Sequence, residues 1–163
     1  MPSADTPETY LKQAYLAELS GEVMMNCLAE RFPERKSALQ LLAGIEQKTA
    51  ASLAASQVFT VTEAEQAEAV SYGRTVLDQF EIQDWSSLVT MMQPYARDAL
   101  QMFQAAETGA PAELADVYRE LTQHEQALLD FFEKEIKGDD GSSILTGYLS
   151  SAQLRAYSPI CVI

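Results

Sequence analysis

Apolar residues recur at intervals of three and four along four long stretches of this chain, which is the spacing that lines one face of an α-helix. The clearest stripe lies toward the C-terminus and comprises Leu114, Tyr118, Leu121, Leu128 and Phe132. Alanine, leucine, glutamate and glutamine dominate these stretches, and no run of alternating β-branched residues interrupts them. The sequence therefore predicts an all-α fold, with residues 1–163 forming a single domain.

Prolines, glycines and capping residues mark where the helices should begin and end. We expect helices over residues 6–32, 34–57, 63–79, 84–107 and 111–137. Pro33 ends the first helix, Asp84 is a good N-cap, and Gly109 separates the last two helices. Residues 138–163 should hold a loop, a short terminal element and an apolar tail, PICVI, that docks on the domain.

The lengths of the connections predict how these helices are arranged. The first two helices are joined by a few residues, as are the last two, so each pair should form an antiparallel hairpin. The link between the pairs, residues 58–83, contains the shorter helix and is long enough to cross a bundle from end to end. This pattern predicts a four-helix bundle with one long crossover, and an up-and-down five-helix bundle is the alternative.

The helix expected over residues 84–107 carries an apolar stripe and an internal proline. The stripe comprises Trp85, Leu88, Met92, Tyr95, Ala99 and Met102. Pro94 should remove one backbone hydrogen bond and kink the helix. The methionines are expected to fill the core, and four tyrosines are expected in or near it: Tyr15, Tyr72, Tyr95 and Tyr118.

Carboxylates interrupt the apolar stripes of three helices. Glu18 fills a slot in the first stripe, and Glu22 follows one turn later. Glu46 lies at the edge of the second stripe, while Glu125, with His124 beside it, fills the missing slot of the last. Burying an unpaired carboxylate costs several kcal/mol, so such a group persists only when protonated, hydrogen-bonded, ion-paired or bound to a cation. Together these residues suggest a shared site.

Clustered carboxylates with an imidazole suit cations such as iron, manganese or zinc. The candidate metal ligands are Glu18, Glu46, Glu125, His124 and Glu22. Ordinary structural roles compete with this interpretation. Glu18 and Glu22 would face solvent or a dimer partner if the helix were rotated, and a lone histidine such as His124 is more often a hydrogen-bonded core or rim residue than a metal ligand. The other alternative is that Glu46 pairs with a basic residue, such as Lys48, Arg97 or Arg119.

Three short stretches, ELSGE at residues 18–22, LLAGIEQKT at 41–49 and ELTQHEQAL at 120–128, carry a resemblance to a known family. With the helix and loop pattern of residues 8–136, the chain resembles the ferritin-like superfamily, in particular its short rubrerythrin-like members. Di-iron bundles of this kind use a Glu on each of two helices and Glu-x-x-His on the other two. The resemblance implies a ferritin-like four-helix bundle in which Glu18, Glu46 and Glu125 stand at ligand positions.

The chain departs from the family where the ligand histidines should be. It has Thr49 three residues after Glu46, and Leu128 three residues after Glu125. His124 is the only histidine and precedes its carboxylate, and the helix over 84–107 offers no matching Glu. The resemblance therefore implies a degenerate di-iron ligand set.

The charge balance argues against several classes of partner. With 24 acidic and 11 basic side chains, the chain has a net charge of −13, which repels phosphate backbones and anionic lipids. We therefore expect neither nucleic-acid nor membrane binding. Two cysteines suggest no disulfide framework, and no signal-peptide pattern or long apolar window occurs, so a cytoplasmic protein is expected. Acidic helical bundles of this size often pair, and a homodimer is expected.

Three functions fit these observations. The first, which the sequence favours, is a non-catalytic ferritin-like module with a decayed metal centre and no cofactor. The second is a carboxylate-ligated iron or manganese protein, for which the resemblance implies oxygen or peroxide chemistry. The third is a bundle that binds a small molecule or lipid in a methionine- and tyrosine-lined space near Pro94.

Overall fold

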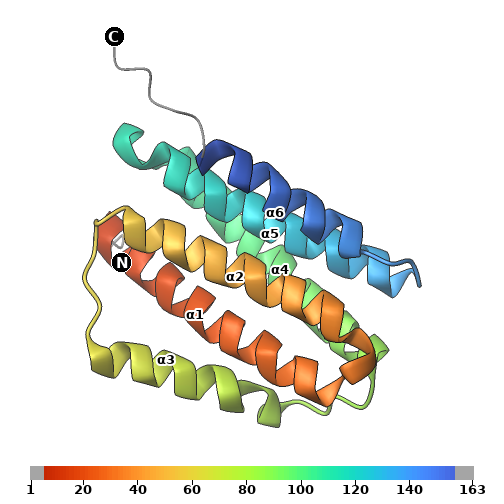
Figure 1. Ribbon diagram of the computed structural model, residues 1–163. Coiled ribbons are helices and arrows are strands. Elements are labelled where there is room, and N and C mark those ends of the chain that lie inside the picture. The colour runs from red at the N-terminus through yellow and green to blue at the C-terminus, as the bar shows by residue number, and fades with distance from the viewer. Residues whose placement is uncertain (1–5, 157–163) are drawn as a thin grey trace.

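The computed structural model of the protein describes residues 6–156, with side chains as far as residue 151. These residues form α-helices joined by turns and short 3₁₀ helices, without a strand, which confirms the all-α prediction (Figure 1). The helices are α1 (Pro7–Arg31), α2 (Lys36–Ala55), α3 (Glu63–Thr75), α4 (Trp85–Thr108), α5 (Ala115–Ile136) and α6 (Ser142–Ala156). The 3₁₀ helices are η1 (Pro33–Arg35), η2 (Val76–Gln79) and η3 (Ala112–Leu114).

Two helical hairpins form the centre of the molecule. α1 packs along α2, and α4 packs along α5, as the short connections predicted (Figure 1). The long link between the hairpins carries α3, which lies along the outer side of α1. α6 packs against both α2 and α5 on the opposite side of the molecule. The hairpins therefore have one additional helix on each outer side.

The sixth helix replaces much of the predicted tail. Residues 138–163 were expected to contain only a short terminal element before the tail, yet α6 is 15 residues long. Gly138 ends α5 in a left-handed conformation, with φ +84°, and Asp140 accepts a hydrogen bond from the Ser142 N–H. Leu145 is fully buried and anchors α6 on the bundle. The PICVI segment lies outside the described residues.

The buried face of α4 differs from the predicted stripe. Tyr95 and Met102 are 56% and 52% exposed, and the buried positions are Leu88, Val89, Ala96, Leu100 and Phe103. Successive helical residues are about 100° apart, so moving a stripe by one position changes which side chains reach the core. Of the four tyrosines expected in or near the core, Tyr118 is buried, whereas Tyr72, like Tyr95, is more than half exposed.

The apolar core is divided into two clusters along the hairpins. The larger cluster includes Leu28, Leu42 and Phe131, and the smaller one includes Leu11 and Leu121. The two clusters lie toward opposite ends of α1, α2 and α5. Between the clusters, these three helices carry buried polar side chains: Glu18, Glu46, Thr49 and His124. A polar layer thus separates the two apolar clusters.

Candidate metal centre

The polar layer is formed by three helices that each contribute one ionisable side chain. Glu18 comes from α1, Glu46 from α2 and His124 from α5, and their residues are 3%, 7% and 1% exposed. On each helix the ionisable residue lies between positions that belong to the two apolar clusters. Because packing on both sides fixes the rotation of the helices, the three side chains are directed into the same space.

The three side chains converge on one point. His124 Nε2 lies 3.4 Å from Glu18 Oε2 and 3.8 Å from Glu46 Oε2. One ligand atom from each residue lies within 4.8 Å of the other two, so the group could hold a metal ion. Glu18 Oε2 and His124 Nε2 are both buried without a hydrogen-bond partner among the described residues. Leaving such atoms unsatisfied costs about 1–3 kcal/mol each.

Thr49 fixes the orientation of the imidazole. Its Oγ1 lies 2.7 Å from His124 Nδ1, in a fully buried hydrogen bond. This contact leaves Nε2 as the ring nitrogen that faces the two carboxyl groups. When Thr49 accepts the hydrogen bond, Nδ1 carries the proton and Nε2 presents a lone pair, the arrangement that a metal-ligating histidine requires.

Gly21 makes room for Glu46. A Cβ atom at Gly21 would lie 2.6 Å from Glu46 Oε2 and 2.7 Å from Glu46 Cδ. These distances are too short for real atoms, so a larger residue at this position would force the carboxyl group to move. Glu46 can therefore lie against the backbone of α1, one turn from Glu18, because residue 21 has no side chain.

Burial pushes all three groups toward their neutral forms. The pKa of Glu18 is raised well above its ordinary value, first by burial and then by the charge of Glu46. Burial raises the pKa of Glu46 to about 7, although a hydrogen bond with Glu18 partly opposes the rise. The pKa of His124 is lowered to about 3 by burial and by the positive charge of Lys48. Burial therefore favours the protonated form of Glu18, and His124 is uncharged near neutral pH.

Glu125 and Glu22, the other two predicted ligands, lie at the border of this group. Burial and the charge of Glu46 raise the pKa of Glu125 to about 8, so it is close enough to interact electrostatically. It is only partly buried and does not belong to the group that could hold an ion. Glu22 accepts a 3.3 Å hydrogen bond from Gln47 Nε2, and its charge raises the pKa of Glu46.

The slot in the α5 stripe that the spacing assigned to Glu125 is occupied by His124. Position 124 is three residues after Leu121 and four before Leu128, whereas position 125 has these two spacings reversed. Both positions therefore satisfy the same helical pattern, and the sequence could not distinguish them. The structure places His124 in the interior and Glu125 beside it.

The basic residues that were considered as partners of Glu46 pair with other carboxylates. Lys48 Nζ lies 3.1 Å from Glu120 Oε1, which belongs to α5. Arg97 pairs with Glu133, and Arg119 pairs with Asp116 and Glu107. The explanation of Glu46 as half of a surface ion pair with one of these three residues is therefore wrong.

A network missed by the sequence analysis covers the outer side of His124. Lys48 and Ser52 both contact Glu120, and the ammonium of Lys48 lies 5.5 Å from the centre of the Tyr148 ring. The Tyr148 ring in turn meets the His124 ring edge to face, with centroids 6.5 Å apart. Tyr148 belongs to α6, so no pattern on α2 or α5 could have indicated this contact.

The buried carboxylate of Glu135, unlike that of Glu18, has hydrogen-bond donors and a positive charge beside it. Glu135 accepts hydrogen bonds from Trp85 Nε1 at 2.9 Å and from the Gly141 N–H at 2.8 Å. Arg35 lies 3.6 Å away and supplies a positive charge. Glu18 has no comparable donor or cation around its Oε2 atom. The two buried carboxylates therefore differ in kind, and only Glu135 is fully explained as a structural residue.

Comparison with known proteins identifies no relative: no protein-family model, curated protein or solved structure matches the chain. Within residues 6–156, no helix combines the length and the apolar character needed to cross a membrane.

Proposed function

We propose that the protein binds one divalent transition-metal cation between α1, α2 and α5, with Glu18, Glu46 and His124 as its ligands. The observation that carries this proposal is the pair of unsatisfied atoms, Glu18 Oε2 and His124 Nε2, which are buried and face each other at 3.4 Å. A cation placed among the three side chains would interact favourably with both atoms.

The donor set suits a borderline cation. Two carboxylates and one imidazole supply oxygen and nitrogen ligands of the kind that bind Fe²⁺, Mn²⁺ and Zn²⁺. Two ionised carboxylates also balance a double positive charge, so the centre would be neutral when Glu125 stays protonated. A bound cation would supply Lewis acidity or, for iron and manganese, redox chemistry. The protein orients the imidazole of His124 through Thr49 and leaves space for Glu46 beside Gly21. It also buries the three ligands away from water.

The resemblance to the ferritin-like superfamily leads to a narrower proposal about the fold and the centre. The two hairpins and the long link with α3 support the proposal that the protein is a ferritin-like four-helix bundle with helices added on its outer sides. Thr49 and Leu128 stand where this family has ligand histidines, and Leu128 is buried in the larger apolar cluster. We therefore propose a centre for one ion, with the second ion of the family lost.

A specific observation also favours the competing proposal, a structural module without metal. The carboxyl groups of Glu18 and Glu46 lie close together and their pKa values are raised, so a proton held between them can take the place of a cation. In that case the layer would be a proton-stabilised core, and the protein would act as a binding or scaffold module. This proposal predicts no stoichiometric metal and no stabilisation by added metal.

Metal analysis of protein purified without chelators distinguishes the two proposals. We expect about one ion of iron, manganese or zinc per chain, or uptake of one by metal-free protein on equilibrium dialysis. Glu18→Gln and His124→Gln should each abolish this uptake, because each removes one ligand from a set of three. Glu22→Gln is the matched control, since Glu22 lies on α1 outside the group and should leave the stoichiometry unchanged. Folded wild-type protein that takes up none of the three metals would establish the structural module instead.

A further inference from the structure

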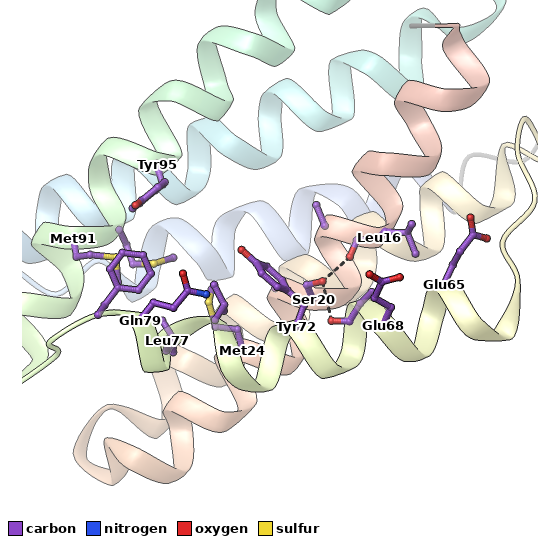
Figure 2. A pocket seen from close by; sticks show the side chains of 16 residues that line it. Leu16, Ser20, Met24, Glu65, Glu68, Tyr72, Leu77, Gln79, Met91 and Tyr95 are labelled. Atoms are coloured by element: carbon purple, nitrogen blue, oxygen red, sulfur yellow. Dashed lines mark hydrogen bonds between the residues drawn. The ribbon is translucent and has the colours of Figure 1, made fainter.

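A large cavity lies between α1, α3, η2 and α4 (Figure 2). Its volume is about 920 Å³, which is in the range of pockets that hold small-molecule ligands. α4 packs along α5 and has few backbone contacts with α1 or α3. The space that separates α4 from α1 and α3 is therefore bordered by side chains. Gly21 lines this cavity and also lies against the side chain of Glu46. Glu18, Glu46 and His124 themselves do not line the cavity.

The wall formed by α1 and α3 is closely packed because small residues bring the two backbones together. A Cβ atom at Gly73 would lie 2.4 Å from the Ser20 carbonyl oxygen, so α3 contacts α1 without an intervening side chain. The Ser20 hydroxyl lies 2.9 Å from the carbonyl oxygens of Leu16 and Ala69, one on each helix. α3 therefore lies as close to α1 as the two backbones allow, and the cavity is present without a bound ligand.

One end of the cavity is lined by thioethers and aromatic rings. Met91 and Tyr95 from α4 lie there, opposite Leu77 and Gln79 of η2 (Figure 2). Further apolar lining comes from Met24, Met92 and Phe80. Tyr95 and Tyr72 are each more than half exposed, at 56% and 55%, although both belong to the lining. Flexible thioethers and exposed rings of this kind are suited to contacting an apolar ligand.

The other end of the cavity is acidic. Glu65 and Glu68 extend from α3 at the end away from Tyr95 (Figure 2), and none of the described lysines and arginines lines the cavity. Glu65 already pairs with Lys12 and caps α3 through Thr62, whereas Glu68 takes no part in either interaction. With a net charge of −13 on the whole chain, this end attracts cations and repels anions.

We propose that this cavity binds a cationic amphiphile, a molecule with an apolar chain or ring system and one ammonium group. The apolar part would lie among Met24, Met91, Phe80 and Tyr95, and the ammonium group would lie near Glu68 at the acidic end. Tyr72, which stands between the two ends in Figure 2, can add a cation–π contact. The cavity's two chemically different ends select for an amphiphile, and its charge excludes fatty acids and other anions.

A matched set of probes tests the proposal by charge. Decylammonium, decanol and decanoate have the same alkyl chain with a positive, neutral or negative head. Each is titrated into wild-type protein, decanol below its solubility limit and the other two below their micelle concentrations. Binding is followed by NMR of ¹³C-methyl-labelled methionines. Decylammonium should perturb Met24, Met91 and Met92 but not Met102, an exposed methionine on α4 that does not line the cavity. Decanol should bind more weakly, and decanoate should bind weakest of the three.

Exposed residues give variants that are expected to fold. Glu68→Gln should weaken decylammonium binding about threefold to fivefold, as for a solvent-exposed ion pair, and leave decanol binding unchanged. Glu63→Gln is the control, because Glu63 is exposed on the same helix but does not line the cavity. Tyr72→Ala should weaken binding of all three probes. The proposal is overturned if decylammonium fails to perturb the three cavity methionines, if Met102 responds equally, or if decanoate binds as well as decylammonium.

Discussion

Nε2 of His124 lies 3.4 Å from Oε2 of Glu18, and neither atom has a hydrogen-bond partner among the described residues. An imidazole and a carboxyl group at this distance on a protein surface would form an ion pair. Here burial raises the pKa of Glu18 well above its ordinary value and lowers that of His124 to about 3, so burial favours the neutral form of each group. Two neutral groups lose much of their mutual attraction, and the polar layer is therefore a costly arrangement in the absence of a cation.

The first prediction concerns the stability of metal-free protein between pH 6.5 and about 8. Glu46 and Glu125 have ordinary pKa values of 4.5 that folding raises to about 7 and about 8. The folded state therefore binds more protons than the unfolded state in this range, and stability falls as the pH rises. His124, whose pKa folding lowers from 6.5 to about 3, opposes the fall only near the lower end of the range, by about 0.4 kcal/mol. We expect a loss of roughly 2 kcal/mol in the free energy of unfolding across the range.

Urea denaturation in the presence of a chelator measures this loss directly. Glu46→Gln should reduce the slope, because the amide stays neutral at every pH, and the variant should be more stable than wild type at the alkaline end. Glu133→Gln serves as the control, since Glu133 pairs with Arg97 on the surface and should keep the wild-type slope. A wild-type stability that rises with pH over this range would contradict the raised pKa values of Glu46 and Glu125.

The second prediction compares two glycines in the middle of helices. Gly21→Ala places a Cβ atom 2.6 Å from Glu46 Oε2, and we expect it to destabilise the protein by about 1–3 kcal/mol and to impair metal uptake. Gly44→Ala is the matched control, because its Cβ would meet only Leu149 Cδ1, at an ordinary 3.8 Å. That substitution should stabilise α2 by up to about 1 kcal/mol through helix propensity. Thermal unfolding of the two variants gives the comparison, and equal behaviour would show that Glu46 does not depend on Gly21.

The sequence predicted the positions of the first five helices well because each has local signals. Thr62 and Asp84 form capping boxes at the starts of α3 and α4, and apolar periodicity continues through α1, α2 and α5. α6 was largely missed because its sequence, rich in serine and containing Gly147, has little amphipathic pattern. Its position depends on contacts with α2 and α5, which no local signal encodes.

The candidate site was predictable as a set of residues but not as a geometry. Glu18 and Glu46 were found because a carboxylate in an apolar stripe is conspicuous within one helix. The choice between His124 and Glu125 depends on the rotation of α5, and adjacent positions differ by about 100°. The hydrogen bond between Thr49 and His124 joins residues 75 apart in the chain, so it follows from the packing of α2 on α5. Sequence patterns within a helix contain no information about that contact.

The third prediction is that Thr49 positions His124. Thr49→Val keeps the shape of the side chain but removes the hydrogen bond to Nδ1, so the imidazole should lose its fixed tautomer and orientation. We expect metal affinity to fall roughly tenfold or more, as for other residues that orient a ligand. His124 is the only histidine in the chain, so its ¹⁵N NMR signals report the tautomer without ambiguity.

The control for this variant is Thr122→Val on α5. Thr122 donates its hydroxyl to the Tyr118 carbonyl oxygen within the same helix and does not contact His124. It should leave both the ¹⁵N signals and the metal affinity at their wild-type values. If Thr49→Val lowers stability but changes neither readout, Thr49 is a packing residue only.

The fourth prediction is that metal binding releases protons. Glu18 and Glu46 must be ionised to act as ligands, yet their raised pKa values keep protons on this pair near neutral pH. We expect about one to two protons to be released per ion at pH 7, so that affinity and the accompanying rise in Tm both increase with pH. Calorimetric titration in buffers with different heats of ionisation measures the number. Asp98→Asn, which changes an exposed carboxylate on α4, should leave it unchanged, whereas Glu18→Gln should abolish binding. Tight binding without proton release would place the metal on surface carboxylates instead of in the polar layer.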